Sequence, residues 1–442
     1  MKRRDFLKIS GAAGLMSVGG TNLVQAQGMH TGPYWLFIEA FGGWDPTSFC
    51  DPKGRGLGPN GDISDYDQND VQTVGNIAYA PPPDSFSGGG GLFSNQEFFT
   101  NHYQRLVVVN GIDMGTNSHV AARRAAFTGS LPQDYPSTAA LIAAELAPDL
   151  AIPYVVGSVS ETTVTNGIVP RVGLGGSELG AVRELAYPNR SVPTDARESR
   201  QYLSNSNLDL VQAASAARRQ RLIASQRLTR INGAQVLHDS VRDIDKSTLG
   251  AFVDSLTNNV SIPSSFVGDS RARQMINDAQ NAFAAFESGA AATAHVRAGG
   301  FDTHDDHDAR HYPRLMGHLA AIDFIIQAAI DRGFGNNLII VMGSDFGRTN
   351  RINSDAGKDH WPIGSMMVWG AQAFVDGNRV VGGTDNEQRA LQVNTSTLDI
   401  DSNGVTLTPE YVHQSLRRLA GVQNGGVAAQ FPFDEAALRI FS

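Results

Sequence analysis

The chain has 442 residues, of which 41% are apolar and 18% are charged, and its formal net charge is −9. These values exclude a globally disordered protein, and the length suffices for two domains or for one large α/β domain with an insertion. The acidic balance argues against nucleic acid as the partner, because its phosphates would be repelled. Cys50 is the single cysteine, so we expect no internal disulfide and a metal held only by oxygen and nitrogen ligands.

The N-terminus has the features of a twin-arginine export signal. Arg3 and Arg4 stand in a basic segment, a weakly apolar run follows over residues 9–24, and a small-residue cleavage site lies at residues 24–26. The run is too short and too rich in glycine for a stable membrane span. We expect residues 1–26 to be removed, which leaves a charge of −12, since they hold four basic residues and one acidic residue. The mature chain is then expected in the periplasm or outside the cell, without a transmembrane segment.

The first part of the mature chain, residues 27–190, alternates strand and helix patterns. Continuous apolar runs indicate buried strands, and the Ala-rich periodic segments indicate helices. The predicted strands are residues 33–41, 105–112 and 152–157, and the predicted helices are residues 120–127 and 136–146.

The pattern changes over residues 191–292. Amphipathic helices rich in Arg, Gln, Ala and Leu are predicted at residues 207–245, 248–256 and 271–286, with hardly a strand candidate among them. This segment therefore predicts a helical insertion or cap between two parts of one sheet.

Residues 293–442 return to the alternating pattern and complete the predicted core. Strands are expected at residues 294–298, 337–343 and 365–370, and helices at residues 313–331 and 409–419. The whole predicts an α/β fold in which a mostly parallel sheet is sandwiched by helices, with a helical insertion.

Several predicted strands end close to an aspartate or a histidine. Asp45 and Asp302 follow Gly-Gly pairs, Asp345 follows a Gly-Ser pair, and His360 lies on a loop just before the next strand. Asp45 taken alone could merely cap a turn before Pro46. Because parallel strands present such side chains at one carboxyl edge, we expect the four to converge there.

The segment at residues 299–311 concentrates metal-binding side chains, since seven of its thirteen residues are Asp or His. Carboxylate oxygens and imidazole nitrogens together suit a divalent cation, and histidine favours zinc, manganese or iron over calcium. The alternative interpretation is a hydrated acidic loop. Recurrence of similar groups at the other strand ends favours a metal site.

A polar turn after the strand at residues 105–112 leads directly into a predicted helix. Ser118 and His119 stand at the start of this helix, where the helix dipole and free N–H groups favour an anion. Ser118 is also an ordinary helix N-cap, and that role alone would explain it.

A second candidate ion site lies near the C-terminus. Asp399, Asp401, Asn403 and Glu410 occupy ligand positions one, three, five and twelve of a calcium loop, with glycine at position six. However, no convincing helix precedes the segment, and it also alternates like a hairpin around an Asn-Gly turn. The hairpin is the preferred interpretation.

Taken together, these motifs resemble domain of unknown function family 1501, itself similar to the alkaline phosphatase and sulfatase superfamily. The matching elements, in chain order, are the twin-arginine leader, Gly42-Gly43-Trp44-Asp45, Ser118-His119 through Gly129, Gly299-Gly300-Phe301-Asp302-Thr303-His304, Ser344-Asp345-Phe346-Gly347-Arg348 and Asp359-His360-Trp361.

The resemblance implies a parallel sheet with two divalent metals, zinc or manganese, at its carboxyl edge. One metal would be bound by Asp45 and Asp345. The other would be bound by Asp302, by His304 or His307, and by His360. The nucleophile position corresponds to Ser118 or His119.

Two departures from the superfamily pattern reduce the expected ligand set. Phe346 stands where phosphatases carry a histidine after the late aspartate, and Asp306 stands where a histidine is usual. The resemblance is therefore compatible with a single metal, or with a descendant that has lost catalysis.

The activity that the resemblance implies is hydrolysis or transfer of a phosphate or sulfate ester, with a small anionic ester as the partner. Arg348 would pair with the non-bridging oxygens through its planar fork, or would be a surface ion-pair residue. The alternative function is a non-catalytic exported binding or surface-assembly protein that retains the fold and takes an envelope ligand.

Overall fold

A computed structural model describes residues 30, 32–58, 61–86, 92–187, eight residues between 203 and 214, and 246–442. The expected export signal at residues 1–26 lies outside the described residues, as does nearly all of the helix expected at residues 207–245. Within the described ranges, no helix is both long and apolar enough to cross a membrane.

One large sheet organises the fold. Its strands are β1 (Tyr34–Phe41), β4 (Leu106–Asp113), β5 (Tyr154–Val156), β6 (Arg171–Gly173), β7 (Thr293–Gly299), β8 (Leu338–Ser344), β11 (Ile363–Gly370) and β12 (Arg379–Gly382). They lie in the order β12-β4-β11-β8-β1-β7-β5-β6, and only β11 runs antiparallel to its neighbours. The mostly parallel sheet predicted from the sequence is therefore confirmed.

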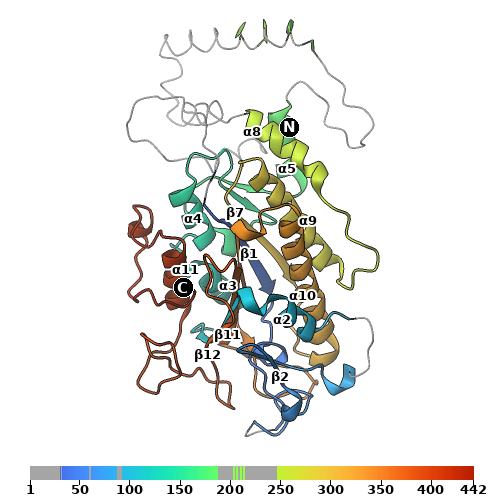
Figure 1. Cartoon of the computed structure of the whole chain (residues 1–442), viewed down its shortest axis with the longest axis vertical. Coiled ribbons are helices and arrows are strands. Elements are labelled where there is room, and N and C mark those ends of the chain that lie inside the picture. Colours follow the sequence, from blue (N-terminus) through green and yellow to red (C-terminus); the bar gives the residue numbers. More distant parts are fainter. Residues whose placement is uncertain are drawn as a thin grey trace.

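Helices cover both faces of this sheet (Figure 1). The helices of one face are α2 (Asn95–His102), α5 (Gly176–Ala186), α8 (Lys246–Ser255), α9 (Ser270–Glu287) and α10 (His307–Asp331), and those of the other are α3 (His119–Thr128), α4 (Thr138–Leu146) and α11 (Pro409–Leu419). Central strands of such a sheet are buried on both sides, which explains their continuous apolar runs. In β1, Leu36 and Ile38 pack under one helical layer, and Trp35 and Phe37 under the other.

Most predicted elements are confirmed to within two residues, whereas the short edge strands β6 and β12 and the helices α2 and α5 were not predicted. Helix α10 begins at His307 rather than at Pro313, which lies inside the helix. Pro313 stands in the second turn of this helix, six residues after its first residue. As a result His307 and His311, one helical turn apart, belong to the helix and not to the preceding loop.

Helix α9, which was assigned to the helical insertion, packs against β7 and α10 and contributes to the core. Helix α8, from the same segment, packs against α5 and α9. Nearly all of residues 191–245 lie outside the described residues, so the insertion or cap expected over residues 191–292 stays a prediction.

The segment after β12 forms neither the expected hairpin nor the calcium loop. Val393 makes antiparallel bridges to both Ile400 and Val405, so the two sides of the turn pair with a third segment. The carboxylate of Asp401 accepts the N–H of Asn403 at 2.9 Å and a side-chain N–H of Asn394 at 3.1 Å.

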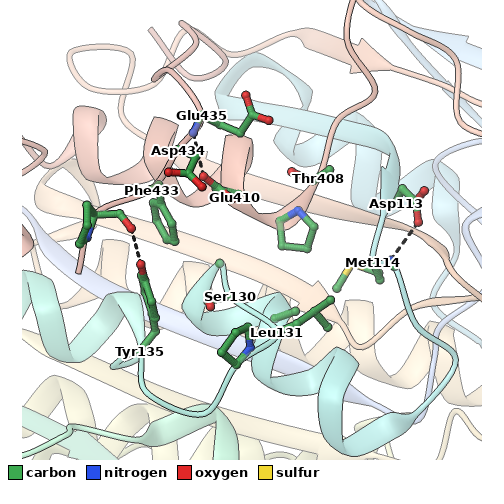
Figure 2. A pocket seen from close by; sticks show the side chains of 16 residues that line it. Asp113, Met114, Ser130, Leu131, Tyr135, Thr408, Glu410, Phe433, Asp434 and Glu435 are labelled. Atoms are coloured by element: carbon green, nitrogen blue, oxygen red, sulfur yellow. Dashed lines mark hydrogen bonds between the residues drawn. The ribbon is translucent and has the colours of Figure 1, made fainter.

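Glu410, the proposed twelfth position of the calcium loop, lies on α11, where its carboxylate accepts the N–H of Glu435 at 2.7 Å. It lines a cavity of about 480 Å³ together with Met114, Leu131 and Phe433 (Figure 2). The four calcium candidates are not brought together. The carboxylate of Asp401 is hydrogen-bonded to Asn394 and Asn403, and that of Glu410 is hydrogen-bonded to the backbone of Glu435.

Candidate metal centre

The centre lies at the carboxyl ends of β8, β1 and β7, which are neighbours in the sheet. The chain turns sharply after β1 at Gly42 and Gly43, with φ values of 116° and 82°. A Cβ atom on Gly42 would lie 2.6 Å from the backbone nitrogen of Asp302, and one on Gly43 would lie 2.9 Å from Phe346. Only glycine permits this close approach of the three strand ends.

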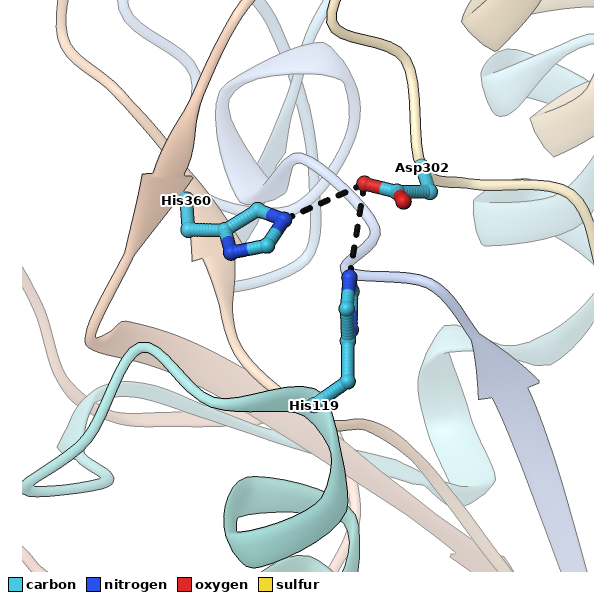
Figure 3. Close-up of side chains that lie close together, drawn as sticks. All are labelled: His119, Asp302 and His360. Atoms are coloured by element: carbon cyan, nitrogen blue, oxygen red, sulfur yellow. Dashed lines mark hydrogen bonds and ion pairs between the residues drawn. The ribbon is translucent and has the colours of Figure 1, made fainter.

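Three side chains from distant parts of the sequence meet at this edge (Figure 3). His119 is the first residue of α3, Asp302 follows β7, and His360 begins the two-residue strand β10 (His360–Trp361). Their ligand atoms all lie within 4.8 Å of one another, a spacing that allows the three side chains to bind one metal ion.

The Oδ1 atom of Asp302 is the point on which the imidazoles converge. It lies 3.4 Å from Nε2 of His119, 3.2 Å from Nε2 of His360 and 3.0 Å from Nε2 of His304. The Nε2 atoms of His304 and His360 are 3.0 Å apart. Four potential ligand atoms from four side chains thus point at one small region.

The hydrogen bonds at Nδ1 of His119 and His360 turn their Nε2 atoms toward Asp302, and Nε2 of His360 lies within hydrogen-bond distance of its Oδ1 at 3.2 Å. Nδ1–H of His119 donates to Oδ2 of Asp345, and Nδ1–H of His360 donates to the carbonyl of Asn117 at 3.0 Å. These partners fix each ring as the tautomer with a lone pair on Nε2. Nε2 of His119 is buried and has no hydrogen-bond partner of its own.

His304 is oriented in the same way but is more exposed. Its Nδ1–H donates to Asp359 at 2.8 Å, which leaves Nε2 to face Asp302. The side chain of His304 is 45% exposed, compared with 22% for His119 and 24% for His360. His304 therefore stands on the solvent side of the group.

The donor set and its spacing fit a divalent ion such as zinc. Zinc bonds of about 2.0–2.1 Å in a tetrahedron place ligand atoms about 3.3–3.4 Å apart, close to the 3.0–3.4 Å separations found here. Burial disfavours a charged His119, but the bond to Asp345 outweighs burial and raises the pKa of the imidazole. A more basic imidazole is a better ligand. Burial also opposes ionisation of Asp302, yet Arg348 lowers its pKa to about 2.

Arg348 is fully buried, which overturns both of its predicted roles. Nη2 donates to Oδ1 of Asp302 at 2.7 Å and to the carbonyl of Gly42, Nε donates to the carbonyl of Gly43 at 3.0 Å, and Nη1 donates to that of Lys358 at 3.1 Å. Its donors are committed to the protein, so it is neither a surface ion-pair residue nor a free fork for substrate oxygens. It ties the strand ends together and holds Asp302 in place.

Asp345 orients His119 by a hydrogen bond and is not itself a member of the group formed by His119, Asp302 and His360. Oδ1 of this buried carboxylate accepts the N–H groups of Gly42 and Gly43 and the hydroxyl of Ser344, and Oδ2 accepts from His119. Both oxygens are therefore used within the protein. The expectation that Asp345 binds a metal directly is corrected accordingly.

Asp45 belongs to a separate, fully buried group. Its Oδ2 lies 2.5 Å from Nζ of Lys358 and 3.2 Å from Nε2 of His307, while Oδ1 accepts the N–H and hydroxyl of Thr47. Its own N–H donates to His311. The lysine ammonium supplies the positive charge that the resemblance assigned to a metal, so Asp45 and His307 are corrected from metal ligands to members of this ion-pair group.

Lys358 was not among the residues predicted for the site, and His311 and Asp359 were noted only as members of longer motifs, without a role of their own. A signal for Lys358 was present, because alternate residues of an extended segment share a side and Lys358 stands two positions before His360. His311 was hidden by the misplaced start of α10. The signal for Asp359 was its place directly before His360 in the Asp359-His360-Trp361 motif.

Ser118 occupies the N-cap position of α3 but makes no side-chain capping hydrogen bond. Its residue is exposed, and both sequence neighbours touch the centre: Asn117 through its carbonyl to His360, and His119 through its ring. The simple capping role that the sequence allowed is therefore not observed. Ser118 lies at the rim of the metal centre with a free hydroxyl group.

Comparisons with known proteins give similarities of fold at low sequence identity. The PsFucS1 sulfatase from Pseudoalteromonas sp. is 9% identical with a TM-score of 0.38, covering 99% of this chain and 78% of its own. A protein in the alkaline phosphatase superfamily from Vibrio parahaemolyticus is 9% identical with a TM-score of 0.34, covering 96% and 76%. The TAB5 alkaline phosphatase is 10% identical with a TM-score of 0.32, covering 81% and 95%. No curated protein matches the sequence.

A family model matches residues 96–401, which is well over half of the chain. The matched region includes His119, Asp302, His304 and His360, while the Gly-Gly turn before Asp45 lies outside it. The chain belongs to the family described as Protein of unknown function (DUF1501).

Proposed function

We propose that this protein is an exported hydrolase of phosphate or sulfate esters with a single divalent metal, zinc or manganese. The observation that carries the proposal is the convergence of three Nε2 atoms on Asp302, with each ring oriented by a separate hydrogen bond at Nδ1. His119, Asp302 and His360 would hold the ion. A bound divalent ion would supply Lewis-acid polarisation of an ester oxygen.

His304 is assigned the role of proton acceptor. Among the three imidazoles it is the most exposed, and its Nδ1–H bond to Asp359 would stabilise the imidazolium formed when Nε2 takes a proton. A catalytic metal site keeps an open position, whereas a structural site is closed by protein ligands. With His119, Asp302 and His360 as the three protein ligands, the fourth position would stay open for water or substrate, and His304 would border it.

The attacking oxygen would come from Ser118 or from water at the same place. Ser118 stands at the start of α3 with its hydroxyl free of capping, between two residues that touch the centre. The N–H groups and dipole of the helix start would attract the anionic group of the substrate. This arrangement supports a charged ester as the substrate class.

Metal content and ester turnover of the His304→Ala variant test the proposal together. Aryl phosphates and aryl sulfates are the substrates, and the His119→Ala variant is the comparison. We expect His304→Ala to retain the metal and lose turnover by about 10²–10⁴-fold, as for loss of a general base. His119→Ala should lose both. Ser118→Ala separates the two nucleophiles, because only a serine mechanism would lose its turnover.

The alternative is an exported binding or surface-assembly protein with a structural metal. It is favoured by the commitment of Arg348 to backbone carbonyls and by the lysine beside Asp45, since both leave fewer groups for an oxyanion. If His304→Ala lost its metal as completely as His119→Ala, and no ester were turned over by the parent, the site would be closed and this alternative would hold.

A further inference from the structure

A second cavity lies beside the loop that carries Asp302, on the side of the first turn of α9 and the N-terminal half of α10. Its volume is about 410 Å³, and Gly300, at the end of β7, forms part of its wall. The polar residues in its lining are Asp269, Arg271, Arg310, Arg314 and His318. None of these five side chains belongs to the metal centre.

His318 lines this cavity with both ring nitrogens unpartnered. It is 1% exposed, and neither Nδ1 nor Nε2 has a hydrogen-bond partner in the protein. Its ring lies against the aromatic rings of Trp44 and Phe301, which offer no acceptor oxygen. Every neutral imidazole carries one N–H donor, and leaving such a donor buried without an acceptor is unfavourable.

Arg314, one helical turn before His318 on α10, has the same deficiency. One end of its guanidinium pairs with Asp269, but its Nε–H is buried and has no acceptor. Residues four apart on a helix are neighbours on one face, so both unpaired donors border the same space. Gly300, with a φ of 108°, leaves room for this arginine, because a Cβ there would lie 2.8 Å from Nε.

The surrounding charge has the sign that an anion requires. Arg271 and Arg310 stand at the edge of the cavity and are about half exposed. Three arginines in the lining are balanced by the carboxylates of Asp269 and of Asp305, which pairs with Arg310. One positive charge is left over at a place with two unpaired buried donors.

We propose that this cavity binds a small anionic ligand whose carboxylate, sulfate or phosphate oxygen accepts hydrogen bonds from Arg314 Nε–H and from His318. Such groups are acceptors only, which is what the two donors lack. The proposal is independent of the ester hydrolysis proposed above. It concerns a separate binding site, which would work whether or not the metal centre is catalytic.

The test is anion binding by the full mature protein in the presence of a chelator, so that no metal-bound anion contributes. Potassium sulfate, phosphate and citrate are titrated by calorimetry and by thermal unfolding, with potassium chloride at equal ionic strength as the reference. Sulfate and phosphate report an oxyanion site, and citrate reports a carboxylate site. We expect at least one of them to bind and to raise the melting temperature above the chloride reference.

Two variants assign the binding to this cavity. His318→Phe keeps the ring shape without a donor, and Arg314→Lys keeps the charge without Nε–H. Each should weaken the binding about tenfold or more, because a charge-assisted hydrogen bond is lost. His318→Phe should melt at or above the temperature of the parent, since it removes an unpaired buried donor.

His295→Phe is the matched control, because His295 is another buried histidine whose ring nitrogens make no hydrogen bond. It lies on β7 outside the cavity lining, with Nε2 3.7 Å from a carboxylate oxygen of Glu39. It should bind the anion as the parent does. The proposal is overturned if the parent responds to none of the three anions. It is equally overturned if His318→Phe and Arg314→Lys both bind as tightly as the parent, since the anion would then lie elsewhere.

Discussion

The ammonium nitrogen of Lys358 lies 2.5 Å from Oδ2 of Asp45, and both side chains are almost completely buried. Burial alone would oppose ionisation of Asp45, but Lys358 and the hydrogen bond with His307 hold its pKa well below the usual range. The pair joins the turn after β1 to the segment before β10. The charge balance of this part of the sheet edge is thus achieved with a protein side chain.

We predict that Lys358→Met strongly destabilises the protein. Removing one partner of a buried ion pair leaves an uncompensated charge, which costs about 3–5 kcal/mol. Chemical denaturation of the metal-free protein measures the change in the free energy of unfolding. The double variant Asp45→Asn/Lys358→Met should recover much of the loss, because no buried charge then remains. A single variant as stable as the parent would show that Lys358 does not neutralise Asp45.

The metal centre predicts a dependence of stability on divalent ions. Added zinc or manganese should raise the melting temperature of the chelator-dialysed parent, since a ligand at a hundred times its dissociation constant adds about 2.7 kcal/mol. Asp302→Asn and His360→Ala remove ligand atoms and should abolish most of this response. His102→Gln is the control, because His102 on α2 pairs with Asp323 outside the centre. A parent that melts at one temperature with and without each ion would contradict the site.

We predict that the folded protein loses stability in acid because of three buried histidines outside the candidate metal centre. Burial lowers the pKa of His295, His318 and His413 to about 3 in the folded protein. In the unfolded chain these histidines bind protons from about pH 6.5 downward, whereas in the folded protein they stay neutral until about pH 3. Their contribution to the free energy of unfolding is therefore complete above pH 6.5 and falls as the pH drops toward 3. Each histidine contributes a slope of at most about 1.4 kcal/mol per pH unit.

This dependence is measured as the free energy of unfolding between pH 7.5 and pH 5 in the presence of chelator. His295→Phe/His318→Phe should flatten the slope by removing two of the three titrating rings. His413 should be left in place, because its ring bonds Thr138 and the carbonyl of Ala126 at 2.6 and 2.9 Å. An unchanged slope in the double variant would mean that other groups cause the acid sensitivity.

The strands and most helices could be predicted from the sequence, because continuous apolar runs indicate buried strands and periodic apolar patterns indicate helices. The carboxyl edge was also predictable, since Asp45, Asp302 and Asp345 each follow a glycine-containing strand end. What each carboxylate does there could not be predicted, because that depends on its neighbours in space. Asp345 accepts hydrogen bonds from two backbone N–H groups and from His119, and Asp45 forms an ion pair with Lys358.

The exchange of roles between His307 and His119 has a similar cause. A helix start displaced by six residues moved His307 from the loop of Asp302 to a helix face that points at Asp45. His119 was assigned to the nucleophile position from its place at a helix start. Its place in the candidate metal centre depends on Asp302 and His360, which lie near it only in the folded chain, and on its bond to Asp345, 226 residues further along the chain.

The twin-arginine signal at the N-terminus predicts that the protein is exported. Changing Arg3 and Arg4 to lysine together should retain the precursor inside the cell, because the twin-arginine route recognises the arginine pair. Cell fractionation and the mass of the recovered chain measure the outcome. Efficient export of this double variant, with cleavage near Ala26, would contradict the prediction of twin-arginine targeting.

The last prediction distinguishes Asp345, which orients a proposed metal ligand, from Asp359, which orients the proposed base. Asp345 is buried and fixes His119, whereas Asp359 is 56% exposed and fixes His304. Asp345→Asn should weaken metal binding about 10–100-fold, as is usual when the hydrogen-bond partner of a ligating histidine is lost. Asp359→Asn should leave metal affinity near that of the parent and lower ester turnover. Metal titration with a competing chelator gives the affinities, and turnover is then assayed at saturating metal. Equal losses of metal affinity in the two variants would place His304 among the ligands and remove it from the role of base.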